Sequence, residues 1–168
     1  MVNPDIHTSF EYAGQTILVD WYAVTNKDAI PNLPWQQVYA VGNFEGRVPL
    51  VTSSSGMKQF NLPGGTIESD ETIEQTLVRE LVEECNMRVV SWEPLGYQIL
   101  TEPNGTNVPQ FRAYATLEKI GEFVNDPGGN VIKNTLVPLD EVASLIDYGL
   151  VGDEMIRLAS PYFAEANS

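Results

Sequence analysis

The chain has 168 residues, the usual size of a single domain, so we expect one domain spanning residues 1–168. Hydrophobic residues make up 43% of it and aromatic residues 10%, enough for an apolar core, which excludes disordered and fibrous classes. Twenty-three Asp and Glu against nine Lys and Arg give a formal net charge of −14, which disfavours duplex nucleic acid and anionic membranes as partners.

Targeting and redox signals are scarce in the sequence. No apolar run approaches the roughly 20 residues of a membrane span, and residues 1–5 lack the basic and apolar parts of a secretory signal. The only cysteine, Cys85, excludes an internal disulfide, and the only histidine, His7, excludes a histidine-rich metal site. We therefore expect a cytoplasmic protein with no membrane partner.

The first 62 residues alternate β-branched and aromatic residues with turn residues, which is typical of strands. Ala13 and Gly14 indicate a hairpin turn, and Pro31 and Pro34 mark a loop. The expected strands span residues 8–12, 15–24, 37–41, 47–52 and 57–62.

Helical periodicity begins at residue 70 and continues to 85. Ser69, Asp70 and Glu71 are expected to open this helix, because an N-cap oxygen and negative charge are favourable there. Three further strands are expected at 89–92, 96–100 and 111–117, a second helix at 139–148 and a third at 153–159. Strands mixed with about three helices predict an α+β domain with α-β-α layers.

Three glutamates, Glu80, Glu83 and Glu84, lie in the last two turns of the first helix. At about 100° per residue their carboxylates fall within about a 100° sector, at the helix end where the macrodipole favours cations instead. They form either a solvated acidic face or a set of metal ligands. The apolar stripe expected to dock this helix on the sheet is Val78, Leu81, Val82 and Cys85.

The segment before the helix contains two consecutive glycines, Gly64 and Gly65. Glycine lets a backbone approach a ligand closely, so this loop is able to bring carbonyl oxygens near the glutamates. Oxygen ligands of this kind suit Mg²⁺ or Mn²⁺, which bind one or two carboxylates together with substrate phosphates. The two features together favour a metal site.

These residues resemble the Nudix hydrolase signature, G-x5-E-x7-R-E-U-x-E-E-x-G-U with U apolar. Asn86 stands where the family has glycine, and asparagine is the usual second choice for a left-handed residue after a helix. Glu68 looks like the additional glutamate of many members. The positions that match are Gly65, Glu71, Arg79, Glu80, Leu81, Glu83, Glu84 and Met87.

The resemblance implies an α-β-α sandwich with a mixed β-sheet. It also implies metal-dependent cleavage of the diphosphate bond in a nucleoside diphosphate linked to another group X, such as a modified dNTP, ADP-ribose or a nucleotide sugar. Glu80, Glu83 and Glu84 would be the catalytic glutamates and would bind Mg²⁺ or Mn²⁺ together with a carbonyl of Gly64 or Gly65. Glu68 would either reach a second metal or remain solvated.

Other roles remain open under the resemblance. Glu71 and Arg79 would pair to brace the loop against the helix, and the general base would be Glu80 or a later residue such as Glu118 or Glu122. A catalytically silent module that binds nucleotides as a sensor is the alternative function, and a homodimer is also open because many relatives dimerise. The candidate substrate contacts are Lys58, Phe60, Pro103 and Arg112.

Overall fold

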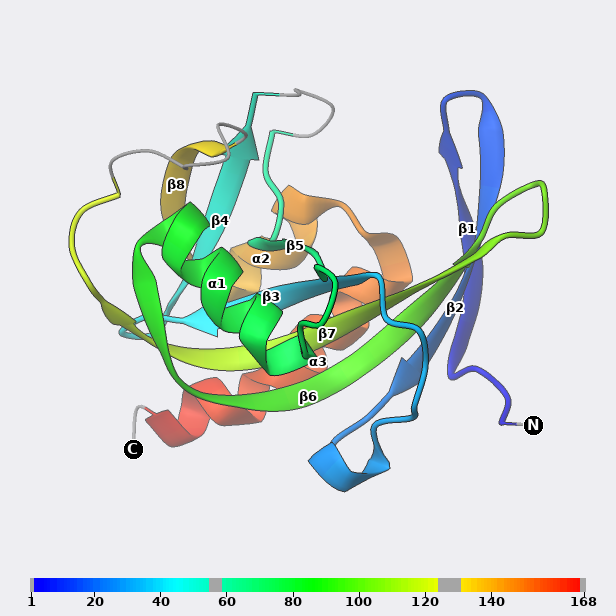
Figure 1. The fold of residues 1–168 in the computed structure, drawn as a ribbon. Coiled ribbons are helices and arrows are strands. Elements are labelled where there is room, and N and C mark those ends of the chain that lie inside the picture. The colour runs from blue at the N-terminus through cyan, green and yellow to red at the C-terminus, as the bar shows by residue number, and fades with distance from the viewer. Residues whose placement is uncertain (1, 55–58, 124–130, 167–168) are drawn as a thin grey trace.

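The computed structural model describes residues 2–54, 59–123 and 131–166, and Figure 1 shows their arrangement. The helices are α1 (Ile73–Cys85), α2 (Leu139–Ile146) and α3 (Gly149–Ala166), with a short 3-10 helix at Lys27–Ala29. The strands are β1 (Ile6–Tyr12), β2 (Gln15–Ala23), β3 (Gln37–Asn43), β4 (Arg47–Ser53), β5 (Gly64–Thr66), β6 (Met87–Thr101), β7 (Asn107–Lys119) and β8 (Val131–Pro138).

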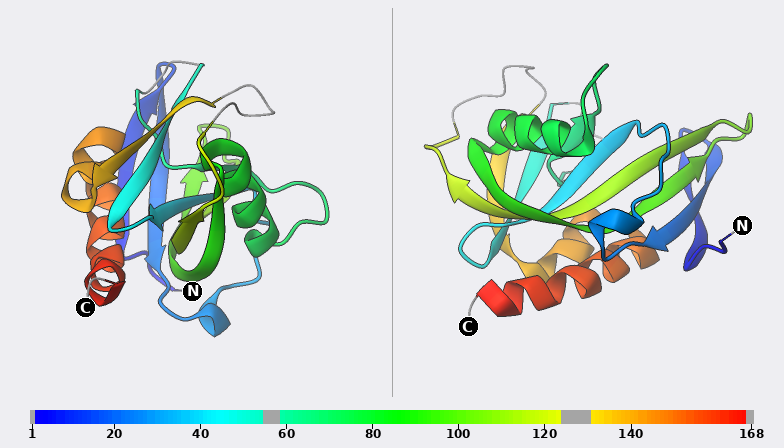
Figure 2. Two further views of the ribbon diagram at one scale, coloured as in Figure 1. Left: turned by 90° about the vertical axis from the view of Figure 1, so that its left-hand side faces the viewer. Right: turned by 60° about the horizontal axis from the view of Figure 1, so that its bottom comes forward.

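The strands form a six-stranded sheet in the order β1-β2-β6-β7-β3-β5 and a two-stranded sheet of β4 and β8. The pair β3 and β7 is parallel and the other pairs are antiparallel, so the larger sheet is mixed. Figure 2 shows α1 on one side of the strands and α2 with α3 on the other. The predicted α+β fold with α-β-α layers and a mixed sheet is confirmed.

Two hydrophobic clusters lie on the two sides of the strands. On the α1 side, Leu77, Leu81 and Cys85 pack with Phe111 and its neighbours, and on the other side α2 and α3 pack around Trp21. The prediction that Val78 and Val82 dock α1 is wrong, because these side chains are 39% and 40% exposed. The buried stripe instead repeats every four residues from Leu77.

The start of α1 also differs from the sequence prediction. The helix begins at Ile73, and Thr72 is its N-cap residue. The Thr72 hydroxyl accepts from the N–H of Gln75 at 3.1 Å, and the Gln75 side chain accepts from the N–H of Thr72 at 2.9 Å. This reciprocal capping box satisfies two backbone donors at once, so it determines the helix start rather than the acidic run at 69–71.

The expected hairpin at Ala13–Gly14 is confirmed, with both residues at positive φ and Tyr12 paired with Gln15. The strand expected at 57–62 is wrong over its described part, where Asn61 makes an isolated bridge to Val51. Residues 57 and 58 lie outside the described residues. The strand that pairs with β3 in this region is β5.

Three boundaries later in the chain are also corrected. The two strands expected at 89–92 and 96–100 are one strand, β6, whose register shifts at two places where it pairs with β7. Strand β8 was not predicted, and its partner β4 is distant in sequence. Helix α2 ends at Ile146, with Asp147 in the left-handed conformation, and α3 begins at Gly149 rather than at residue 153.

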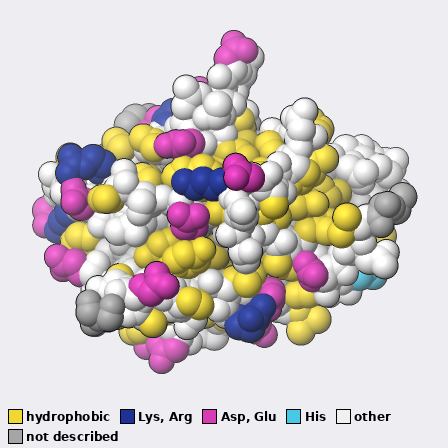
Figure 3. All heavy atoms as spheres, turned by 90° about the horizontal axis from the view of Figure 1, so that it is seen from below, with side chains coloured by type: hydrophobic (Ala, Val, Ile, Leu, Met, Phe, Trp, Pro, Cys, Tyr) yellow, Lys and Arg dark blue, Asp and Glu magenta, His cyan; other side chains and the backbone are white. Residues whose placement is uncertain are grey.

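No helix in residues 2–54, 59–123 and 131–166 is long and apolar enough to cross a membrane. On the face seen in Figure 3, the Lys and Arg side chains are isolated among acidic and apolar side chains and form no basic patch. This distribution agrees with the strongly negative net charge.

Candidate functional site

Strand β5 and helix α1 approach each other closely at the two consecutive glycines. The backbone N–H of Gly64 donates to Oε2 of Glu84 at 2.9 Å. A Cβ added at Gly65 would lie 2.6 Å from Oε1 of Glu80, which is closer than real Cβ contacts allow. The structure therefore brings Gly64, Gly65, Glu80 and Glu84 together, and the missing side chain at Gly65 leaves the space that Glu80 occupies.

The backbone conformation at position 64 also requires a glycine. Its φ is +146°, a region that other residues rarely adopt, and a Cβ there would lie 2.1 Å from the carbonyl oxygen of Val38. Strand β5 can lie between β3 and the glutamates of α1 because its second residue, Gly65, also has no side chain.

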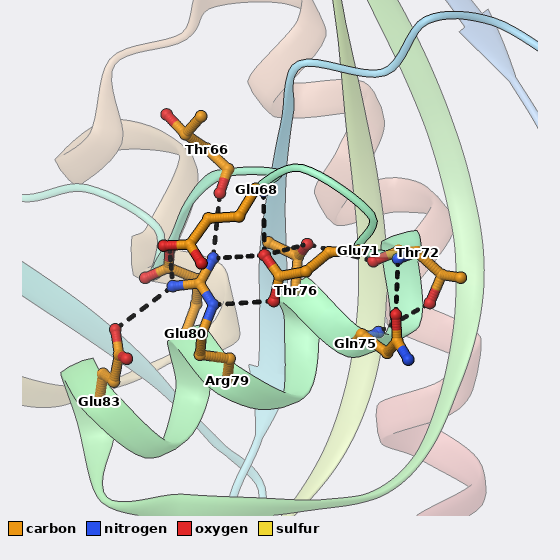
Figure 4. A network of polar contacts seen from close by, with 9 residues as sticks. All are labelled: Thr66, Glu68, Glu71, Thr72, Gln75, Thr76, Arg79, Glu80 and Glu83. Carbon is orange, nitrogen blue, oxygen red and sulfur yellow. Dashed lines mark hydrogen bonds and ion pairs between the residues drawn. The ribbon is translucent and has the colours of Figure 1, made fainter.

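Arg79 is at the centre of the carboxylate cluster (Figure 4). Its Nε and Nη2 each donate to one oxygen of Glu71 at 2.9 Å, which is a bidentate pair. Its Nη1 lies 3.0 Å from Oε1 of Glu80 and 3.4 Å from Oε2 of Glu83, and Nη2 also donates to the carbonyl oxygen of Thr66 at 3.1 Å. One cation thus holds three carboxylates and the end of β5.

This network perturbs the ionisation of Glu71 and Arg79. The hydrogen bonds from Arg79 lower the pKa of Glu71 to about 2, and the N–H of Glu68 and the hydroxyl of Thr76 add to the effect. The same pair raises the pKa of Arg79, with Glu80 contributing. Both side chains therefore remain charged across the neutral range, and the pair ties the loop before α1 to the helix.

The oxygen-rich donor set suits a hard divalent cation in its chemistry. Within the described ranges, however, no three His, Cys, Asp or Glu side chains converge closely enough to hold a metal ion. Arg79 contacts Glu80 and Glu83, while the N–H of Gly64 contacts Glu84. The donor atoms therefore fit a divalent cation in their chemistry, while in this structure the three carboxylates are engaged by Arg79 and by the backbone of β5.

Glu68 lies at the edge of the cluster. Figure 4 shows its exposed side chain extending over Arg79 toward the other carboxylates, while its backbone N–H donates to Oε1 of Glu71 at 2.9 Å. Glu68 therefore lies next to the cluster, but its side chain is exposed to solvent.

Glu118 and Glu122, the later candidates for the general base, make ion pairs with basic residues of β6 and β7 and not with the carboxylate cluster. Glu118 pairs with Arg88 across strands β6 and β7, and Glu122 lies 2.5 Å from Lys119 with its side chain 86% exposed. Glu80, in contrast, is buried at the cluster.

Asn86 contributes a contact that sequence reasoning missed. It adopts the left-handed conformation expected for the residue after α1, with φ 52° and ψ 43°. Its Nδ2 also donates to the carbonyl oxygen of Glu122 at 2.9 Å, and its carbonyl accepts from the N–H of Ile120 at 3.0 Å. Asn86, which replaces the signature glycine, thus connects the segment after β7 to the end of α1. The departure from the signature at this position was the sequence feature that could have indicated such a contact.

The four candidate substrate contacts lie in different places. Arg112 is buried on β7, and Phe60 is half-buried against the core on the α2 and α3 side. Pro103 is exposed in the β6–β7 turn, which lies beside the β1–β2 hairpin and away from α1 (Figures 1 and 2). Lys58 lies outside the described residues.

Tyr39 of β3 also lies beside the cluster. Burial raises the pKa of its hydroxyl, and Glu84 and Glu80 contribute to the same shift while Arg112 opposes it. A Cβ at Gly64 would lie 2.8 Å from its ring. No local pattern identifies this residue, because the contact depends on the pairing of β3 with β5.

A protein-family model described as NUDIX domain matches residues 37–158. No curated protein sequence matches the chain.

Several solved structures share the fold. A point mutant of the Bacillus subtilis pyrophosphohydrolase BsRppH is similar with a TM-score of 0.69 and 18% identity, covering 92% of this chain and 97% of that one. A NUDIX hydrolase from Nitrosomonas europaea has a TM-score of 0.57 and 20% identity, covering 77% and 90%. A UDP-X diphosphatase has a TM-score of 0.55 and 16% identity, covering 81% and 68%.

Proposed function

This chain belongs to the Nudix family of hydrolases, which act on pyrophosphate bonds, and from that premise we propose that it cleaves the diphosphate of a nucleoside diphosphate linked to another group, with Mg²⁺ or Mn²⁺ bound. The similar structures include a pyrophosphohydrolase and a UDP-X diphosphatase, which supports this substrate class. A small-molecule substrate also suits a protein of net charge −14, because divalent cations can lie between its carboxylates and the phosphates.

The observation that supports the proposal most directly is the contact between β5 and α1. Glu80 occupies the space beside Gly65, and Glu84 accepts from the N–H of Gly64. Glu83 lies on the same helix and shares Arg79 with Glu80. The carboxylates of α1 are therefore held directly against the backbone of β5, and ligands carried by two such elements suit a small hard cation.

Each residue has a defined task under this proposal. Glu80, Glu83 and Glu84 are the metal ligands, with a carbonyl oxygen of Gly64 or Gly65. Bound divalent cations would neutralise the diphosphate oxygens and make a water molecule more acidic, which removes the main barrier to attack on phosphorus. Arg79 and Glu71 keep the loop and helix in place through their bidentate pair. Glu68 is a candidate ligand for a second metal.

We assign the general base to Glu80. It is buried against β5 at the cluster, whereas the side chains of Glu118 and Glu122 are exposed. A base must lie within hydrogen-bonding reach of the water that it activates, and the position of Glu80 meets this requirement better.

A phosphate-release screen over nucleotide diphosphate compounds tests the proposal. With Mg²⁺ or Mn²⁺ we expect turnover that excess EDTA abolishes. Glu83→Gln should reduce kcat by about 100-fold or more, since it removes the charge of a ligand and keeps its shape. Glu74→Gln, an exposed carboxylate in the first turn of the same helix, is the matched control and should change kcat less than twofold.

Two results would contradict the proposal. Turnover that persists in excess EDTA would show that the reaction does not need a divalent metal. Near-full activity of Glu83→Gln would show that the assigned metal ligands are wrong. Tight nucleotide binding in isothermal titration without turnover of any compound would support the catalytically silent, nucleotide-binding module instead.

A further inference from the structure

Strand β1 is one edge of the six-stranded sheet, and none of the described strands pairs with its outer side (Figure 1). It has seven residues, whereas β5 at the opposite edge has three and lies against α1. Proteins usually protect a long edge with lysine, proline or a covering element, because its free N–H and C=O groups attract a further strand. The sequence of β1 contains neither lysine nor proline. The edge at β1 is therefore open to strand pairing.

The hairpin turn determines which backbone groups of β1 face outward. Tyr12 and Gln15 flank the two-residue turn, so they form a hydrogen-bonded pair between β1 and β2. Such pairs occur at alternate residues of an antiparallel ladder, so every second residue of β1 directs its N–H and C=O groups away from β2. These residues are His7, Ser9 and Glu11.

Apolar side chains are also exposed beside this edge. Phe10 and Tyr12 are 43% and 52% exposed. They lie on the same face of β1 as Ile6, whose side chain packs against the core on the α2 and α3 side. Glu11 is the only acidic residue of β1, although the whole chain has a net charge of −14. Two copies of this acidic chain can therefore meet at β1 with little local charge repulsion.

We propose that β1 pairs in the antiparallel direction with β1 of a second copy of this chain, about a two-fold axis at Ser9, so that the two larger sheets form one continuous sheet. In this register all seven residues of each strand are paired, and the outward backbone groups of the two strands meet. The surface is separate from the proposed active site, because β1 and β5 lie at opposite edges of the sheet.

Charged side chains complement each other in this register. His7 of one copy lies opposite Glu11 of the other, and the two-fold axis repeats this pair of a basic and an acidic residue. Contacts within each copy hold both side chains on this face. Nδ1 of His7 lies 2.5 Å from Oδ1 of Asp20, and the hydroxyl of Thr16 donates to Oε1 of Glu11 at 2.5 Å. Each of these contacts uses one polar atom, so the second ring nitrogen and the second carboxylate oxygen serve the other copy.

The apolar side chains complement each other on the opposite face. Tyr12 lies opposite Ile6 of the second copy, and Phe10 lies opposite Thr8. The two Phe10 rings are diagonal neighbours across the axis, a separation that aromatic side chains can span. Pairing would therefore remove the two exposed aromatic side chains of β1 from water, which favours association.

Charge and strand length distinguish this register from its neighbours. An axis at Thr8 would place Glu11 opposite Asp5 of the other copy, and an axis at Glu11 would place two glutamates opposite each other. An axis at Phe10 would leave His7 opposite the hairpin turn of the other copy. The proposed axis avoids like-charge pairs and pairs the full length of the strand.

Sedimentation velocity of the full chain tests this pairing. We expect the wild-type protein, 18.6 kDa per copy, to sediment as a dimer at micromolar concentration. Ser9→Pro removes an outward-facing N–H, which an edge strand tolerates, so it should raise the dissociation constant by about tenfold or more. Ser9→Ala keeps the N–H and is the matched control, with the dissociation constant unchanged within about twofold. Circular dichroism should show that both variants are folded.

A cysteine at the axis gives a second measurement. In the proposed pair the two Cα atoms of residue 9 lie about 5.5 Å apart, which suits a disulfide. Ser9→Cys should therefore form a covalent dimer under mild oxidation, and the native Cys85 is buried and should not react. Leu18→Cys is the matched control, because Leu18 is exposed and pairs with Ser9 on β2. Three strand spacings, about 14 Å, would separate its two copies, too far for a disulfide.

Three results would overturn the proposed dimer. A wild-type protein that stays monomeric would leave the edge to a strand of a different protein. A dimer that Ser9→Pro does not weaken would lie at another surface. Equal cross-linking of Ser9→Cys and Leu18→Cys would show random collision and not a defined register. If Ser9→Pro fails to fold, the two cysteine variants decide.

Discussion

Replacing Glu71 by Gln should destabilise the protein through the loss of one ion pair. In the wild-type chain both oxygens of Glu71 accept from Arg79 at 2.9 Å, and the two side chains are mostly buried, at 18% and 24% exposure. A hydrogen bond to a charged group contributes about 1.5–3 kcal/mol, and partial exposure places this pair near the lower end of that range. With an m-value of about 2 kcal/mol/M, we expect the urea midpoint at pH 7 to fall by roughly 1 M.

The pH dependence of this difference follows from the lowered pKa. The folded carboxyl gains a proton only near pH 2, while the unfolded one gains it near 4.5. The stability contributed by a depressed carboxyl is present above the unfolded pKa and is lost as the pH falls toward the folded pKa. The difference in unfolding free energy between the wild-type protein and Glu71→Gln should therefore be constant above about pH 5.5 and shrink from about pH 4.5 downward.

Glu154→Gln is the matched control for this prediction. Glu154 also makes a two-point pair with an arginine, Arg157, at 2.7 Å, but Arg157 is 69% exposed at the surface of α3. Solvent screens such a pair, so its loss should move the midpoint much less. A pH-independent difference for Glu71→Gln, or a midpoint change no larger than that of Glu154→Gln, would refute the reasoning.

The remaining predictions concern Asn86 and Gly65. Asn86→Ala loses the hydrogen bond to Glu122 and places a side chain with no local compensation at positive φ, so urea denaturation should show a loss of about 2 kcal/mol. Asn86→Gly loses only the hydrogen bond and should cost about 1 kcal/mol or less, and the opposite order would disprove this account. Gly65→Ala puts a methyl group 2.6 Å from Oε1 of Glu80, so kcat should fall by about 10- to 100-fold. An unchanged melting temperature would show that the fold persists, and unchanged kcat would reject the assignment of Glu80.

The fold class and the residues of the cluster were readable from the sequence because both depend on short-range periodicity. A helix places Glu80, Glu83 and Glu84 on one sector whatever the surroundings, whereas the pairing of Glu71 with Arg79 was implied only by the resemblance to the Nudix signature. The left-handed conformation of Asn86 is equally local, because it follows from its place directly after the last turn.

Local patterns misjudged features that several weak signals compete to determine. The acidic run before α1 looked like a helix start, but the capping box of Thr72 and Gln75 satisfies more backbone donors. Val78 and Val82 matched an apolar stripe, yet Leu77 faces the sheet in their place. Hydrophobicity alone does not tell which of two adjacent stripes a helix buries, because the sheet beneath it decides.

Only the tertiary structure decided which distant residues meet. Glu84 meets the N–H of Gly64, which lies 20 residues earlier, because β5 pairs with β3 and α1 folds back over it. Arg112 came to lie beside Tyr39 because β3 and β7 are parallel neighbours, a pairing that joins residues far apart in the chain. Strand order follows from the total burial of both sheet faces, and this quantity belongs to the whole chain and not to any segment of it.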